Sequence, residues 1–342
     1  DAPVGLGQPP TRAGAALPPQ RPCSQYGDRM HLEHWESYYR GGALVSCPMG
    51  LEPGYTGEVR DAWVTFFATL PDGARVLDIG TGNGAVALIA KETAATLGRS
   101  FEIHGVDLAQ IDPVRHVANG ATLLAGIEFH PSVPAEQLPF EANGFDAASG
   151  QYALEYTQRD RALAELFRVL KPGGRGQFLL HHRDSVIVRN ADESLRHAAL
   201  VLDDTKVFRL LRRYLEAERD TPKTATGPWQ ELVAAGNRLQ AEARASKGSL
   251  LLPSTVDALQ RVFEQRGKAS VPVLLRAVDQ MEQELRASVR RLQDLGGAAF
   301  SEAELREVLS QAEAAGFVDV QHREQRHGGQ HLVAWRVNLA KP

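Results

Sequence analysis

The sequence of 342 residues is poor in cysteine and has no long apolar run. Its two cysteines, Cys23 and Cys47, are far fewer than a small secreted protein held together by disulfides contains. They form no C-x-x-C pair, so the sequence predicts neither a disulfide framework nor a cysteine-based metal site. We expect free thiols and a cytoplasmic protein.

No segment reaches the ~18 consecutive apolar residues of a membrane-spanning helix. Residues 1–24 are rich in Pro, Gly and Ala and lack the apolar stretch of a secretion signal, so we predict a flexible tail there. The formal net charge is only −4 and there is no basic stripe, which argues against nucleic acid as the main partner. These absences leave a globular protein that needs no membrane.

Short apolar runs alternate with amphipathic stretches over the first half of the chain. Strand and helix in alternation are typical of a parallel sheet with helices on both faces. The predicted strands are Arg75–Ile79, Glu102–Val106, Ile127–His130, Phe145–Ala148 and Gly176–His182, and the predicted helices are Arg29–Arg40, Tyr55–Leu70, Ala85–Leu97, Pro113–Ala125 and Arg161–Leu170, the last capped by Thr157 or Asp160.

The alternation stops at Asp184–Gly297, which reads as amphipathic helices, most clearly at Leu195–Leu215 and Leu274–Leu295. It resumes with Ser301 and Glu304, a capping-box pattern, before a helix at Glu302–Ala315 that ends at Gly316. Two strands joined by a glycine turn, Phe317–Arg323 and His331–Leu339, complete the chain as an antiparallel hairpin.

We therefore predict a doubly wound, mainly parallel seven-stranded α/β sheet with a terminal antiparallel hairpin and a helical insertion after the fifth strand. The expected division is a tail at 1–24, amino-terminal helices at 25–70, a Rossmann-like core at 71–183, a helical cap at 184–298, and the rest of the core at 299–342.

A glycine loop follows the first strand of this sheet, in the segment Asp78-Ile79-Gly80-Thr81-Gly82-Asn83-Gly84. Glycine permits positive φ and leaves no side chain between backbone and ligand, and the next helix points its free N–H groups at the loop. Asp107 ends the second strand, where a carboxylate can accept hydrogen bonds from both hydroxyls of a ribose. The two features predict a cofactor that contains adenosine, without separating NAD from S-adenosylmethionine (SAM).

Further motifs resemble the class I SAM-dependent methyltransferases. The glycine loop is similar to their D-x-G-x-G-x-G signature, and Lys171-Pro172-Gly173-Gly174 is similar to the turn before their fifth strand. Ala135-Glu136-Gln137-Leu138-Pro139-Phe140 resembles their A-E-x-L-P-F segment. The resemblance covers residues 60–182 and 299–340 and implies SAM as cofactor and methyl transfer as activity.

The resemblance also implies a role for individual positions. The methionine part of SAM would lie against Gly80, Gly82 and Gln151, with Asp78 near its amino group. Asp107 would hold the ribose and Leu108 would flank the adenine, whose edge would meet Ala135 and Glu136. Pro134 departs from the family, which often has Asp there, so recognition of the adenine amino group would depend on Ala135 or Glu136.

Candidates for catalysis lie where the fourth and fifth strands end. Tyr152 and Glu155 follow the fourth strand, and His181 and His182 end the fifth. Histidine titrates near neutral pH and can deprotonate an acceptor, but strand alternation allows only one of the pair to face the pocket. The alternative is a surface strand end for the two histidines and a packing role for Tyr152 and Tyr156.

Two amino-terminal features have a chemical and a structural interpretation. Trp35, Tyr38 and Tyr39 either close over the cofactor or pack in the core. His31 and His34 have helix-face metal-ligand spacing but no third ligand, so we expect a solvated helix face and no metal site.

The leading functional hypothesis is methyl transfer to a small organic acceptor, with the helical insertion as a cap over the acceptor. The alternatives are an RNA or protein methyltransferase that uses the insertion for recognition, a NAD-dependent oxidoreductase, and a SAM-binding regulator without catalysis. A dimerisation arm is the alternative role of the insertion, which would make the protein a homodimer.

Overall fold

A computed structural model describes residues 32–47, 54–220, 225–246 and 248–342. Its centre is a seven-stranded sheet in the order β3-β2-β1-β4-β5-β7-β6, in which β1 to β5 are parallel and β7 runs antiparallel to β5 and β6. The strands are β1 (Arg75–Ile79), β2 (Glu102–Asp107), β3 (Ile127–Pro131), β4 (Phe145–Gln151), β5 (Leu170–His181), β6 (Val318–His327) and β7 (His331–Ala340). The predicted architecture is confirmed.

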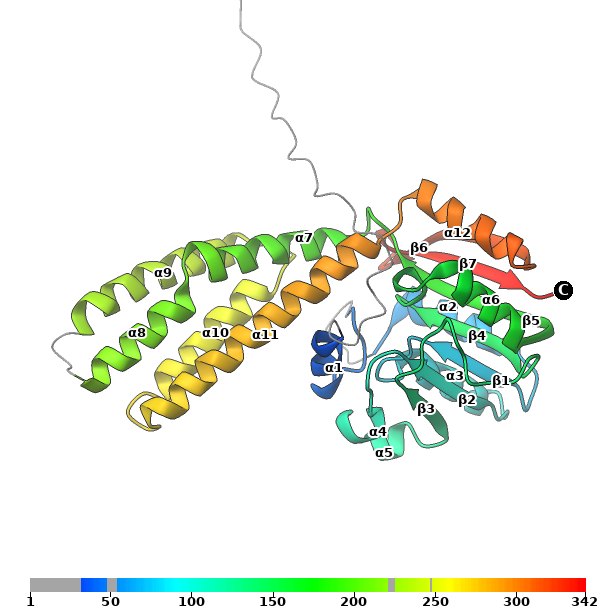
Figure 1. Cartoon of the computed structure of the whole chain (residues 1–342), viewed down its shortest axis with the longest axis horizontal. Helices are drawn as coiled ribbons and strands as arrows, with labels where there is room; N and C mark the ends of the chain where they lie inside the picture. Colours follow the sequence, from blue (N-terminus) through cyan, green and yellow to red (C-terminus); the bar gives the residue numbers. More distant parts are fainter. Residues whose placement is uncertain (1–31, 48–53, 221–224, 247) are drawn as a thin grey trace, which may run out of the picture.

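Helices cover both faces of the sheet, so its central strands are apolar on both sides (Figure 1). One core cluster joins the sheet to α2 (Gly57–Ala68) and α3 (Ala85–Thr96). The other joins it to α6 (Arg159–Val169) and α12 (Glu302–Ala314). The predicted capping box at Ser301 and Glu304 opens α12, and Gly316 follows it with φ of 104°.

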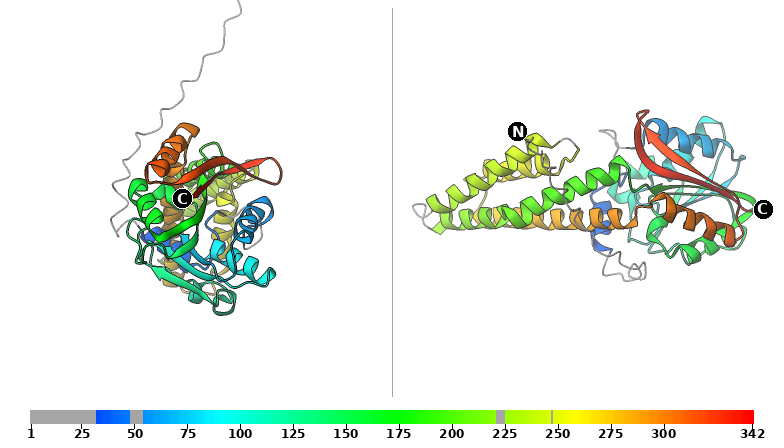
Figure 2. Two further views of the ribbon diagram at one scale, coloured as in Figure 1. Left: turned by 90° about the vertical axis from the view of Figure 1, so that its right-hand side faces the viewer. Right: turned by 90° about the horizontal axis from the view of Figure 1, so that it is seen from above.

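The segment after β5 forms an elongated bundle that extends away from the sheet (Figures 1 and 2). A core cluster of its own runs through residues 198–285. The bundle contains α7 (Val186–Ala199), α8 (Val207–Asp220), α9 (Thr226–Ala245), α10 (Leu251–Glu264) and α11 (Val271–Ala298), with a π-helical turn at Leu200–Asp204. α1 (Glu33–Arg40) lies between this bundle and the sheet (Figure 1).

Three local predictions are wrong in detail. Pro113–Ala125 forms two short helices, α4 (Pro113–His116) and α5 (Gly120–Leu123), because Asn119 adopts a left-handed conformation between them. The residue at the amino cap of α6 is Gln158, without a side-chain cap bond, instead of Thr157 or Asp160. The periodic stretch Leu195–Leu215 is interrupted after the π-turn, where Lys206 has φ of 52°.

Other predictions concern groups outside the sheet. Cys47 is buried and free, whereas Cys23 and the predicted tail lie outside the described residues. Among the described helices, none combines the length and apolar character that crossing a membrane requires.

Candidate functional site

A cavity of about 700 Å³ opens at the carboxyl ends of β1, β2 and β4. This is the edge at which parallel α/β sheets bind ligands, and the volume lies in the range of small-molecule sites. Part of its wall comes from the sheet, through residues such as Gly80, Asp107 and Gln151. The opposite wall comes from α1 and α11, which contribute Trp35 and Arg290 among others.

The glycine loop leaves no room for side chains at two of its positions. Gly80 has φ of 62°, and a Cβ there would lie 2.2 Å from the Cβ of Ala153. Gly82 has φ of 52°, and a Cβ there would lie 2.7 Å from the ring of Tyr39. Only glycine fits both the backbone conformation and the space at these positions. Gly80 lines the cavity, whereas Gly82 lies under the ring of Tyr39 and does not line it.

Asp107 connects the glycine loop to the end of β2. Its Oδ2 accepts a hydrogen bond from the N–H of Gly82 at 2.8 Å, and its Oδ1 accepts one from the N–H of Ala109 at 2.8 Å. Burial raises the pKa of this carboxyl to about 6. Each oxygen keeps a further lone pair, and Asp107 lines the cavity, which fits an acceptor for ribose hydroxyls.

Asp78 lies behind the loop and does not line the main cavity. It borders a separate space of about 20 Å³, enough for one water molecule, together with Gly80 and Gln151. The hydroxyls of Thr81 and Ser149 donate to its two oxygens, each at 2.7 Å. Burial raises its pKa to about 6. This carboxyl therefore holds the glycine loop in position. Any effect on a cofactor amino group in the main cavity would be indirect.

The adenine side of the predicted site is bounded by the loop after β3. Leu108, Pro134, Ala135 and Glu136 all line the cavity. Leu108 is 37% exposed, whereas Ala135 is buried. Oε1 of Glu136 accepts a hydrogen bond from the N–H of Gln158 at 2.6 Å, so this side chain already has one partner in the protein.

Gln151 at the end of β4 presents an unused donor. Its Oε1 accepts a hydrogen bond from the indole N–H of Trp63 at 2.6 Å, which fixes the orientation of the amide. Its Nε2 is buried without a hydrogen-bond partner among the described residues. An orphaned amide donor beside the glycine loop fits a ligand carboxylate, such as the one in the methionine part of SAM.

α1 is held over the glycine loop from two sides. On the bundle side, Nε2 of His34 lies 2.7 Å from Oδ2 of Asp294, and Nη1 of Arg291 donates to the carbonyl of His34 at 3.0 Å. On the loop side, Nδ2 of Asn83 donates to the carbonyl of Tyr39 at 3.0 Å. The sequence allows the aromatic stripe either to close over the cofactor or to pack in the core. In the structure, Trp35 and Tyr39 line the cavity.

The rest of this stripe and the neighbouring histidines differ from expectation. Tyr38 faces away from the cavity and donates to the carbonyl of Val45 at 2.7 Å. The prediction of a solvated face for His34 is wrong, because it is buried and bonded to Asp294. His31 lies outside the described residues.

Of the two histidines that end the fifth strand, His181 faces the cavity. Its ring stacks on that of Tyr152 with centroids 4.0 Å apart, and its Nδ1 has no partner among the described residues. Burial lowers the pKa of His181 to about 3, so the expectation that it titrates near neutral pH is wrong. It is a neutral imidazole that can donate or accept a hydrogen bond.

The other candidates lie around this pair. The hydroxyl of Tyr152 donates to the carbonyl of Val333 at 3.3 Å, and its φ is 57°. His182 does not line the cavity; it stacks on Trp335 at 4.1 Å, and its Nδ1 accepts from the N–H of Asp184. Glu155 is buried, binds the N–H of His181 at 2.7 Å and has a pKa raised to about 7 by burial.

Sequence reasoning missed the α11 wall of the cavity, formed by Arg290, Gln293 and Asp294. These residues lie far along the chain from the glycine loop, and nothing in a single sequence indicates which face of α11 meets it. Arg161 at the start of α6 was also missed, although its position just after the fourth strand placed it near the pocket mouth.

Comparison with known proteins gives matches to the segment that contains the glycine loop and Asp107. A family model described as a methyltransferase domain matches residues 76–174. The chain is 31% identical over 125 residues to the ubiquinone/menaquinone biosynthesis C-methyltransferase of Xanthomonas oryzae pv. oryzae, covering 35% of this chain and 49% of that protein. The Geobacter sulfurreducens enzyme of the same name is 36% identical over 115 residues, covering 32% and 42%. The chain thus spans less than half the length of these curated relatives.

A similar solved structure is that of Burkholderia thailandensis 1,6-didemethyltoxoflavin-N1-methyltransferase with 1,6-didemethyltoxoflavin and S-adenosylhomocysteine bound. It is 15% identical, covers 95% of this chain and 93% of that chain, and has a TM-score of 0.46. The matched segment 76–174 contains the glycine loop, Asp107 and Gln151 on the strand order described above. Residues 76–174 of the chain thus match a methyltransferase domain and are similar to class I SAM-dependent methyltransferases.

Proposed function

We propose that this protein transfers a methyl group from SAM to a small organic acceptor. The observation that carries the proposal is that one cavity joins the donor residues of the sheet to a wall of aromatic and basic side chains from α1, α6 and α11. Donor and acceptor would share this space, which excludes bulk water from between them. Such positioning is the main requirement of a direct displacement at the methyl carbon.

The residues present fit the cofactor, as the orphaned amide of Gln151 and the absence of a side chain at Gly80 on the cavity wall indicate. Asp107 would hold the ribose hydroxyls, and Ala135 with Glu136 would border the adenine. When bound, SAM supplies an electrophilic methyl group on a positively charged sulfur. The chain itself holds the donor in a fixed orientation through the loop, β2 and β4.

The acceptor wall favours a planar, electron-rich acceptor. Rings of Trp35, Tyr39, Tyr156 and His181 line this side of the cavity, and flat ligands gain stabilisation from such rings. The neutral His181 would orient an acceptor oxygen or nitrogen by a hydrogen bond, because a ring with a pKa of about 3 is a weak base. The names of the curated relatives, C-methyltransferases of quinone biosynthesis, agree with an aromatic acceptor.

The helical segment 184–298 would act as a cap that selects the acceptor. Its last helix, α11, lines the cavity through Arg290, Gln293 and Asp294, whereas the family match ends at residue 174. Acceptor choice would therefore depend on parts of this chain that the matched domain does not contain.

Calorimetry with S-adenosylhomocysteine tests the donor half. Wild type should bind it in a 1:1 ratio and should not bind NAD. Asp107→Ala removes charge-assisted hydrogen bonds worth about 1.5–3 kcal/mol each, so affinity should fall at least about 100-fold. Asp61→Ala, an exposed carboxylate on α2, is the control and should bind as wild type does. Preference for NAD would refute the proposal.

The acceptor half is tested by methyl transfer to a panel of phenols, quinols and aromatic amines, followed by mass spectrometry. Turnover of at least one compound supports a small acceptor. Binding of S-adenosylhomocysteine with transfer only to RNA or protein would refute that class, and binding without any transfer would indicate a regulator.

A further inference from the structure

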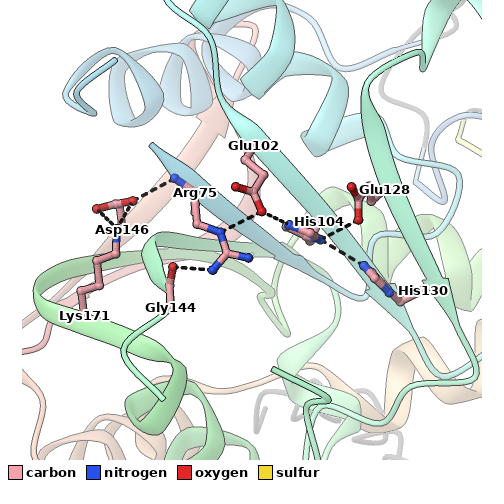
Figure 3. Close-up of polar contacts among 8 residues, drawn as sticks. All are labelled: Arg75, Glu102, His104, Glu128, His130, Gly144, Asp146 and Lys171. Carbon is pink, nitrogen blue, oxygen red and sulfur yellow. Dashed lines mark hydrogen bonds and ion pairs between the residues drawn. The ribbon is translucent and has the colours of Figure 1, made fainter. Parts of the chain in front are cut away.

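Two histidines and a glutamate from neighbouring strands meet on one face of the sheet. His104 belongs to β2, and Glu128 and His130 belong to β3 (Figure 3). The register pairs His104 with Glu128 and Val106 with His130, so alternation puts the three side chains on the same face. None of the three lines the cavity described above.

The separations of their polar atoms suit a single small cation. Nδ1 of His104 lies 3.1 Å from Nε2 of His130 and 3.5 Å from Oε2 of Glu128. All three residues offer ligand atoms within 4.8 Å of one another. In a tetrahedral zinc site with bonds of about 2.0–2.1 Å, neighbouring ligand atoms are about 3.3 Å apart. The three residues therefore converge like ligands around one ion.

Glu102 and Arg75 fix the orientation of His104. Its Nε2 lies 2.8 Å from Oε1 of Glu102, and that same oxygen accepts from Nε of Arg75 at 2.8 Å (Figure 3). Arg75 is itself anchored on the carbonyl of Gly144 at 3.0 Å. Metal-binding histidines usually donate their other ring N–H to a carboxylate. Donation to Glu102 leaves Nδ1 of His104 unprotonated and aimed at His130.

Apolar rings enclose one side of the cluster and solvent reaches the other. Phe140 lies 5.4 Å from the ring of His104 and 5.2 Å from that of His130, and Phe145 lies 5.6 Å from His104. The side chain of Glu128 is 67% exposed, whereas that of His104 is 7% exposed. An ion could enter from solvent, and water could occupy a fourth position.

We propose that His104, Glu128 and His130 bind a divalent transition-metal ion of the zinc class, which ties β3 to β2. Two imidazoles with one carboxylate suit zinc and its neighbours, whereas Mg²⁺ and Ca²⁺ prefer oxygen ligands alone. Among the described strands, β3 lies at one edge of the sheet and pairs with β2 alone. The ion would add a cross-strand link at this edge, independently of methyl transfer.

Titration of the chelator-treated full chain with Zn²⁺, in competition with a chromophoric chelator, tests the site. Wild type should bind one equivalent, and Co²⁺ should give the visible spectrum of a tetrahedral complex. His130→Ala should weaken binding at least 10-fold and Glu128→Gln should also weaken it. His322→Ala, an exposed histidine of β6, is the control and should bind as wild type does. His104 is left intact because it is buried.

Thermal unfolding gives an independent readout. Excess Zn²⁺ should raise the midpoint of wild type and of His322→Ala by several degrees, and should not raise that of His130→Ala. Binding of S-adenosylhomocysteine by every variant would show that each is folded, whatever the outcome for the metal. Absence of 1:1 binding, or equal binding by His130→Ala, would overturn the proposal and leave a hydrogen bond between two histidines.

Discussion

The hydrogen bond between His34 of α1 and Asp294 of α11, here called the clasp, can be tested quantitatively. α1 has eight residues, too few for an isolated helix to be stable, so its position over the glycine loop depends on its contacts. Asp294→Ala removes the bond of 2.7 Å to His34. That bond is partly buried, because the side chain of Asp294 is 27% exposed, and its net contribution should be about 1 kcal/mol.

A double-mutant cycle isolates this contribution. His34→Ala, Asp294→Ala and the combined variant are unfolded in urea and compared with wild type, and the coupling energy should be about 1 kcal/mol. The contacts of Arg291 remain in every variant: its bond to the carbonyl of His34 and its position 4.6 Å above the ring of Tyr38. Arg286→Ala, which removes an exposed ion pair on the same helix, is the control and should cost less than about 0.5 kcal/mol.

The clasp should also matter for the cofactor. If α1 loses about 1 kcal/mol of docking free energy, the affinity of Asp294→Ala for S-adenosylhomocysteine can fall up to about fivefold. A coupling energy below about 0.3 kcal/mol would refute the reasoning for the clasp. Unchanged affinity would show that α1 keeps its place over the loop without α11.

Three further changes have defined outcomes. Gly80→Ala places a Cβ 2.2 Å from that of Ala153 and should abolish binding of S-adenosylhomocysteine in calorimetry; Gly73→Ala, at φ of 72° with nothing within 4 Å, should cost only the backbone strain of about 1–2 kcal/mol in urea unfolding. Asp78 has a folded pKa of about 6 against 3.8 unfolded, so the folded state binds more protons between these values and stability falls as pH rises through them. Wild type should therefore lose up to about 3 kcal/mol relative to Asp78→Asn between pH 4 and pH 7, and parallel pH profiles in urea unfolding would contradict this. His181→Phe keeps the ring but not the nitrogens, so methyl transfer should slow about tenfold while S-adenosylhomocysteine still binds; an unchanged rate would remove His181 from the acceptor site.

The part of the cavity formed by the glycine loop and Asp107 was predictable, because the sequence patterns that indicate it are local. The apolar run of β1, the glycine loop and Asp107 each depend on a few consecutive residues whose conformational needs are distinctive. β1 accordingly has the predicted bounds. The break at Asn119 was not predictable in the same way, because left-handed backbone at a non-glycine residue follows from the surrounding packing.

The wall of the cavity formed by α1 and α11 depends on contacts between distant parts of the chain. His34 and Asp294 are 260 residues apart, and their bond requires a fold to bring α1 beside α11. The grouping of His104, Glu128 and His130 likewise depends on the register of β2 against β3, which periodicity alone does not specify. The wrong expectation that His181 titrates near neutral pH has a similar origin, since its pKa follows from burial and not from residue type.

The chain leaves the sheet for the bundle and returns to it at almost the same point. The N–H of Phe300 donates to the carbonyl of His181 at 2.9 Å, and the N–H of Arg183 donates to the carbonyl of Phe300 at 3.0 Å. The helical segment between them therefore begins and ends at neighbouring positions, which these two backbone hydrogen bonds join. A change in the length or packing of this segment would leave the strand order intact. It would alter the wall of the cavity that α11 forms and leave the glycine loop as it is.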